Sequence, residues 1–184
     1  DAIKWLISKD YWVIRMGKLA SKEIKIDSDK YIDFSFSNNK TDLIDIWLFA
    51  KCNACITTSS GPDQISIYSK KPVMFMIMPL MHLYSFSNSF TFSKNLVWKK
   101  TGKKLTVKEY LDHSYTMTKN YEEKGIEIFQ PNEEEILEYV KEFMKFFKNE
   151  KLNLRDNKKQ IKFWKLLRNH QDFDKYHNKI HPNA

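Results

Sequence analysis

Residues 54–78, ACITTSSGPDQISIYSKKPVMFMIM, decide the fold of this chain. Ala54–Thr58 is a short run with β-branched residues, which predicts a strand. A turn at 59–62 follows, and residues 63–69 are typical of a short helix. Val73–Met78 is continuously apolar, as expected for a parallel strand that is covered on both faces. A strand, a helix and a second strand in this order predict parallel pairing through a right-handed crossover.

The rest of the chain continues this alternation of strands and helices. Hydrophobic periodicity predicts further strands at 11–14, 31–36 and 125–129, and helices at 2–9, 42–51, 106–113, 133–149 and 157–169. Either Asn39 or Thr41 is expected to cap the helix at 42–51, and Thr106 the helix that it begins. The intervening segments 18–30 and 79–96 are predicted to be irregular.

Three of these elements carry predictions about burial. The strand at 11–14 is expected to be buried, and so is the helix at 42–51, because apolar residues surround most of it. The last helix is expected to turn Ile161, Phe163, Trp164 and Leu167 inward. The predicted fold is α/β, a Rossmann-like parallel sheet flanked by helices. Residues 1–150 are expected to form this domain, and 151–184 a helical extension that packs on it or trails from it.

The composition is that of a basic globular protein. Hydrophobic residues make up 42% of the 184 and aromatic residues 15%, which argues against disorder. The formal net charge is +8, yet lysine supplies all but three of the 31 basic residues, scattered among Asp and Glu. This pattern is typical of a solvated surface. A basic nucleic-acid-binding module is the alternative interpretation.

Composition also bears on location. The longest apolar stretch, Val73–Tyr84, is interrupted by Pro79 and His82 and is too short to cross a bilayer. Cys52 and Cys55 make no disulfide framework and are expected to be structural thiols, which fits a cytoplasmic setting. Because the chain does not begin with methionine, we expect a fragment of a longer protein whose partner domain is missing.

The turn after the strand at 54–58 is the first candidate for a binding site. Four hydroxyls, from Thr57 to Ser60, line it, and Gly61 allows a ligand to approach the backbone closely. Pro62 suits the start of a helix, where N–H groups favour an anion such as a diphosphate. A helix-capping turn without a ligand explains the same residues. The sequence has no P-loop and no dinucleotide-binding glycine motif.

Arg15 is the second candidate, because it follows a predicted strand and stands beside Gly17. A guanidinium binds phosphate in a bidentate geometry that lysine does not offer. An ordinary salt bridge is the alternative interpretation. His82, after the apolar strand, is either a further cleft residue or a bystander. Ligands bind at the carboxyl ends of parallel strands, so we expect these positions to meet the turn at 57–62 on one edge.

Several segments carry a resemblance to a known family. VIRMG (13–17), TDLIDIWL (41–48), CITTSSG (55–61) and KPV (71–73) follow one another in an order that resembles a bacterial family of glycosyltransferases. LTVKE (105–109) and the segment 125–144 extend the similarity over most of the chain. Such enzymes pair two Rossmann-like domains around a cleft, in the GT-B arrangement. The resemblance implies that this chain is the C-terminal, nucleotide-sugar-binding half.

The resemblance also implies roles for individual residues. Arg15 would be catalytic, by neutralising the donor phosphate as the leaving group departs. The implied donor-binding residues are Arg15, Gly17, Thr58, Ser59, Ser60, Gly61, Pro62, Asp63 and His82. One departure from the family is that no acidic residue stands at the usual ribose-binding position in the helix after the Ser-Gly turn, unless Asp63 takes that part.

The implied partners are a nucleotide sugar and a glycan acceptor. The base that activates the acceptor hydroxyl would come from the missing N-terminal domain. The resemblance implies no metal and no cofactor beyond the donor. The setting would be cell-surface polysaccharide synthesis, in the cytoplasm or at the membrane periphery. A related sugar-nucleotide enzyme, such as an epimerase, is an alternative.

Overall fold

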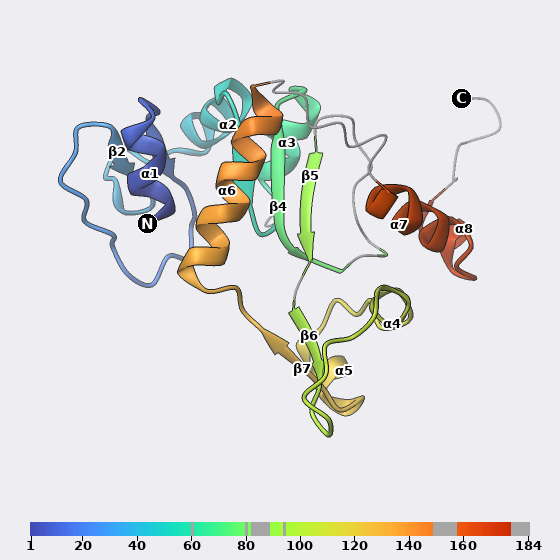
Figure 1. Cartoon of the computed structure of the whole chain (residues 1–184). Coiled ribbons are helices and arrows are strands. Elements are labelled where there is room, and N and C mark those ends of the chain that lie inside the picture. Colours follow the sequence, from blue (N-terminus) through green and yellow to red (C-terminus); the bar gives the residue numbers. More distant parts are fainter. Residues whose placement is uncertain (60, 80, 82–88, 94, 149–157, 178–184) are drawn as a thin grey trace, which may run out of the picture.

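The computed structural model describes residues 1–59, 61–79, 81, 89–93, 95–148 and 158–177. Its central feature is a parallel sheet of three strands in the order β3-β4-β5 (Figure 1). These strands are β3 (Cys55–Thr57), β4 (Val73–Met78) and β5 (Ser89–Ser93). A second parallel pair joins β1 (Val13–Arg15) to β2 (Tyr31–Asp33). The predicted α/β class, with parallel strands flanked by helices, is confirmed.

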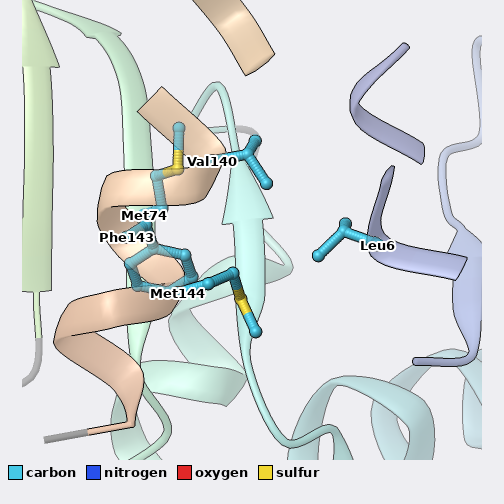
Figure 2. Packing of buried hydrophobic residues seen from close by; sticks show 5 residues of the cluster. All are labelled: Leu6, Met74, Val140, Phe143 and Met144. Carbon is cyan, nitrogen blue, oxygen red and sulfur yellow. The ribbon is translucent and has the colours of Figure 1, made fainter. Parts of the chain in front are cut away.

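Helices cover both faces of the three-stranded sheet. One face packs on α1 (Ala2–Ser8) and α6 (Glu133–Phe147), and the other on α2 (Asp42–Lys51) and α3 (Asp63–Tyr68). Figure 2 shows Met74 of β4 against Val140, Phe143 and Met144 of α6, with Leu6 of α1 facing them.

The residues of β4 bear out the prediction of a strand that is covered on both sides. Val73 and Phe75 point to the opposite face from Met74, where they pack with Cys55 and with side chains of α2 and α3. The side chains of Val73, Met74 and Phe75 are each at most 1% exposed. The continuous apolar run therefore has the burial expected of a central parallel strand.

A smaller unit lies beyond the carboxyl end of β5 (Figure 1). It contains β6 (Asn95–Trp98), β7 (Ile126–Phe129), α4 (Val107–Asp112) and α5 (Thr118–Glu123). The strands β6 and β7 pair in an antiparallel manner, and Leu96, Leu105, Tyr121 and Ile126 form the unit's core. The predicted strand at 125–129 is thus present, but it belongs to this pair and not to the parallel sheet.

The last two helices pack on the described chain. They are α7 (Lys158–Arg168) and α8 (Phe173–Tyr176). Leu167 of α7 is fully buried against Leu111 of α4 and Met81. His170 Nε2 lies 2.9 Å from Asp112 Oδ1, which adds a polar link to α4.

The predicted helix caps are present where the sequence placed them. Thr41 caps α2 by accepting a hydrogen bond from the Ile44 amide at 3.2 Å. Thr106 forms a capping box with Glu109 at the start of α4. A second capping box, from Asn132 and Glu135, starts α6.

Several burial and boundary predictions are wrong. The helix α2 has no buried residue, because only one side of it meets α3 and the sheet. Its other side exposes Leu43 (76%), Ile46 (49%) and Trp47 (57%). In β1, Ile14 is also exposed, since the face of this pair on which it lies is open. Ile161 of α7 points to solvent, while Leu167 is buried and Phe163 and Trp164 are partly buried.

Two predicted segments have different backbones from those expected. The strand predicted at 31–36 ends at Asp33, and Phe34–Phe36 forms a short 3₁₀ helix, η1. The segment predicted to be irregular at 79–96 contains β5 and the start of β6. In β5, serine and threonine alternate with Phe90 and Phe92, which pack on the α6 side of the sheet.

No helix within these described ranges has both the length and the apolar character required to cross a membrane.

Candidate functional site

The candidate residues lie at or just after the carboxyl ends of β1 and β3, each of which is a strand of a parallel sheet. Arg15 is the last residue of β1, and Thr57 is the last residue of β3. Val13 at the start of β1 and Ala54 just before β3 both pack against the cluster around Met74. The two strands therefore begin beside the same core, although they belong to separate hydrogen-bonded sheets.

The β3–α3 turn is held by two buried side chains. The Thr57 hydroxyl donates to Asp63 Oδ2 at 2.8 Å, and it accepts from the Ser59 amide at 3.0 Å. Thr57 is 9% exposed and Asp63 is completely buried. This pair links the end of β3 to the first residue of α3.

The backbone of the turn has two left-handed residues and leaves open space beside one of them. Ser59 has a φ of +65° and Gly61 a φ of +94°, both in the left-handed region. A Cβ atom at Gly61 would meet no atom within 4 Å, so the space beside this glycine is open. Thr58, Gly61 and Pro62 are exposed. The described residues of the turn thus present hydroxyl and backbone groups to solvent, next to the hydrogen bonds of Thr57 with Asp63 and Ser59.

Asp63 differs in placement from the other predicted residues of this turn. Its burial means that the carboxylate supports the turn from inside and does not face solvent. The assignment of Asp63 to the donor-binding residues stays a prediction, and the structure shows its carboxylate bonded to Thr57 inside the protein. The predicted residues Ser60 and His82 lie outside the described residues.

Arg15 forms a salt bridge, as the alternative interpretation of this residue expects. Its Nη1 donates to Asp33 Oδ2 at 2.7 Å and to the carbonyl of Lys22 at 2.9 Å. Both bonds come from the same nitrogen, so the planar guanidinium keeps further donors. The side chain remains 25% exposed. Arg15 is therefore a paired cation with residual access to solvent.

Asp33 is the counter-ion and is itself well covered. Its side chain is 7% exposed, and Oδ2 also accepts from the Ile24 amide at 2.8 Å. Burial raises the pKa of Asp33, but the Ile24 amide and the Arg15 guanidinium outweigh this, and the net pKa lies below its usual value of 3.8. The carboxylate is thus ionised at neutral pH and cancels the charge of Arg15.

Two lysines that the sequence did not single out lie at the same end of β1. Lys40 Nζ donates to the carbonyl of Gly17, and Lys18 Nζ lies 2.8 Å from Asp42 Oδ1. These contacts bring the start of α2 beside the end of β1. Lysine is so common in this chain that neither position gave a signal in the sequence.

The charges of the two lysines are balanced differently. Asp42 raises the pKa of Lys18 through a hydrogen bond and its charge. Within the described chain, Lys40 has no carboxylate in salt-bridge range. Lys40 is therefore a cation beside Gly17 whose charge is not cancelled by such a neighbour.

The two cysteines are free, as predicted, and lie near the turn on its buried side. Burial raises the pKa of the Cys55 thiol to about 12. Cys52 is half-buried, and its Sγ contacts the Phe49 carbonyl at 3.3 Å. A thiol with so high a pKa is a poor nucleophile, so the structural role predicted for Cys55 fits its surroundings.

The structure brings Gly17, Lys18 and Lys40 together, and separately Thr58, Ser59, Gly61 and Pro62. The helices α2 and α3, which start at these two places, pack side by side. The arrangement offers cations, hydroxyls and an open glycine at strand ends, which are groups that bind anions. Comparisons with protein-family models, with curated proteins and with solved structures give no match to this chain.

Proposed function

We propose that this chain is the nucleotide-sugar-binding half of a glycosyltransferase of GT-B type. The β3–α3 turn would hold the donor diphosphate, with Thr58, Ser59 and Gly61 contributing hydroxyl and backbone donors. The observation that carries the proposal is the open, supported turn at the carboxyl end of β3 in a parallel α/β sheet. Ligands of such sheets bind in that position.

The charges near β1 give the proposal its electrostatic part. Lys40, at the Gly17 carbonyl, would supply positive charge to the diphosphate. Arg15 would use the donors that Asp33 and Lys22 leave available, and it would stabilise the charge that develops on the departing diphosphate. The base that activates the acceptor hydroxyl would belong to the partner domain. A glycan is the acceptor class that the family resemblance supports.

A binding experiment with charge-matched variants tests this function. UDP-glucose and GDP-mannose are titrated by calorimetry and by thermal unfolding; at about 100 times its Kd a donor stabilises the folded chain by roughly 2.7 kcal/mol. Thr58→Asp should abolish the effect by repelling phosphate, whereas the uncharged control Thr58→Asn should retain it. Since Thr58 is exposed, both variants should fold.

The outcomes separate this proposal from the alternatives. Absence of binding by either nucleotide sugar would overturn the proposal. Binding that Thr58→Asp leaves unchanged would place the donor elsewhere. Salt-sensitive binding of RNA with no response to nucleotide sugars would instead support a basic nucleic-acid-binding module. Product analysis with an acceptor present would distinguish transfer from epimerisation.

A further inference from the structure

A group of exposed lysines lies at the end of the small β6–β7 unit, and the proposed function does not use it. No Asp or Glu occurs in the sequence from Asn95 to Lys108, whereas lysine is frequent there. We call the group the lysine tip. Its members, all exposed, are Lys99, Lys100, Lys103, Lys104 and Lys124.

A tight hairpin holds the first four of these lysines together. Val97 and Lys104 form an antiparallel bridge. The Trp98 amide donates to the carbonyl of Lys103 at 3.0 Å, and the Gly102 amide donates to the carbonyl of Trp98 at 2.8 Å. Gly102 has a φ of +66°, a left-handed conformation that glycine adopts without strain. The backbone of this turn is therefore well supported, while its lysine side chains are exposed.

Lys124, which follows α5, joins the hairpin through its neighbour. The Lys99 amide donates to the carbonyl of Gly125 at 2.9 Å, which brings the end of α5 beside the turn. Within the described chain, no carboxylate lies in salt-bridge range of any of the five lysines. Their charges are thus close together in the fold, and no salt bridge cancels them.

The acidic residues of α5 and β7 leave an excess of positive charge at the lysine tip. Glu123 Oε1 lies 3.7 Å from Lys119 Nζ and is paired with it. Glu122 and Glu127 are exposed, and they oppose only part of the charge of the five lysines. Like charges held close together repel one another, and an anionic partner relieves this repulsion.

The form of the lysine tip indicates a broad anionic partner. A Cβ atom at Gly102 would meet no atom within 4 Å, so the turn is open to its surroundings. A lysine ammonium is a point charge on a flexible stem, unlike the planar fork of arginine that fits a single phosphate. Such a group suits an extended field of negative charge better than one enclosed anion.

The aromatic side chains beside the lysine tip favour a lipid surface over single-stranded nucleic acid. Trp98 and Tyr110 pack against the core of the unit, and Tyr121 is buried within it. The indole N–H of Trp98 also donates to Glu109 Oε1 at 3.1 Å. These rings are therefore not free to stack on bases, which is how proteins commonly hold single strands. An anionic bilayer surface attracts clustered lysines without such rings.

We propose that the lysine tip docks this protein on the surface of an anionic lipid bilayer. Strands β3, β4 and β5 are parallel, so their carboxyl ends lie at one edge of the sheet, and the small unit continues from that edge (Figure 1). Docking would therefore place the edge that carries the β3–α3 turn on the membrane side of the molecule. The inference goes beyond the proposed function and does not require nucleotide-sugar binding.

Vesicle sedimentation without any nucleotide sugar tests the inference. The probes are vesicles of phosphatidylcholine alone and vesicles of equal parts phosphatidylcholine and phosphatidylglycerol. The wild type should bind only the anionic vesicles, and high salt should weaken this binding, because salt screens exposed charges. Each lysine near such a surface strengthens binding about fivefold, so Lys100→Gln/Lys103→Gln should weaken it roughly 25-fold.

A matched double variant separates the lysine tip from the net charge of the chain. Lys4→Gln/Lys51→Gln removes the same charge from exposed lysines of α1 and α2, and it should bind as the wild type does. Equal weakening by the two double variants would overturn the inference, because net charge alone would then explain binding.

Two further results would also overturn the inference. One is absence of wild-type binding to the phosphatidylglycerol vesicles. The other is tighter binding to single-stranded RNA than to these vesicles at the same salt concentration, which would assign the lysine tip to nucleic acid. Each result leaves the proposed function intact, since that function is tested by the nucleotide-sugar titrations and the Thr58 variants.

Discussion

Arg15 Nη1 lies 2.7 Å from Asp33 Oδ2, and the two residues are register partners at the last position of two parallel strands. The salt bridge therefore closes the carboxyl end of the β1–β2 pair. Through the Lys22 carbonyl and the Ile24 amide it also fixes the segment that connects the two strands. One ion pair thus holds together the ends of both strands and the segment that connects them.

Removing Arg15 should destabilise the protein, because it leaves a buried carboxylate without its cation. We expect Arg15→Ala to lower the free energy of unfolding by about 1–3 kcal/mol, as measured by urea denaturation. In the double variant Arg15→Ala/Asp33→Asn, part of this loss should be recovered, because the unpaired charge is gone. Equal losses in the single and double variants would show that the two side chains are not coupled.

The Asp33 carboxylate should make stability depend on pH in acid. Its pKa is lower in the folded chain than its usual value of 3.8. Its contribution is therefore complete above about pH 4 and is lost as the pH falls through the lowered value. Urea unfolding at pH 6, 4 and 3 should show the stability difference between wild type and Asp33→Asn shrinking toward acid. A difference that grows as the pH falls would contradict this sign.

Cys55 should be inert in the folded protein. With a pKa of about 12 and 7% exposure, roughly one Cys55 thiol in ten thousand is ionised at pH 8. In a Cys52→Ser variant, a thiol-reactive dye should modify the native chain only at the rate of unfolding and should react at once in urea. Rapid native labelling would show that Cys55 is exposed. The Cys55→Ser variant reports the half-buried Cys52 for comparison.

The α7–α4 packing should depend on Leu167. This side chain is completely buried against Leu111 and Met81. Leu167→Ala should cost about 2–5 kcal/mol of packing energy and should speed proteolysis within residues 158–177. Ile161→Ala, on the same helix at 55% exposure, should have little effect. Equal protease resistance in all three proteins would show that α7 does not depend on this contact.

The sequence correctly predicted the features that depend on residues close together in the chain. The apolar run of β4, the cap at Thr41 and the Thr106 capping box depend on residues close in the chain, and each is present. The stripe of α6 also buries Val140, Phe143 and Met144 as its periodicity indicates. These features required no knowledge of distant neighbours.

Predictions that depended on distant partners were less successful. Apolar residues around most of α2 predicted burial. A helix is buried on all sides only where other elements surround it, and none of the described elements covers Leu43 or Trp47. In β5, serine and threonine alternate with phenylalanine, and because serine is common in loops the sequence predicted an irregular segment here. At the candidate site, the sequence identified Arg15 but not Asp33, because their proximity arises from strand register. Asp63 is the first residue of α3, and neither its burial nor its bond to Thr57 is visible in the sequence.

Amide NMR of the labelled chain during titration with UDP-glucose tests the central claim most directly. If the β3–α3 turn binds the donor diphosphate, the amides of Ser59 and Gly61 should show the largest and earliest shifts, with Gly17 following. Thr58→Asp should abolish these changes and Thr58→Asn should preserve them. Saturating UDP-glucose that leaves the Ser59 and Gly61 amides unmoved would contradict the account.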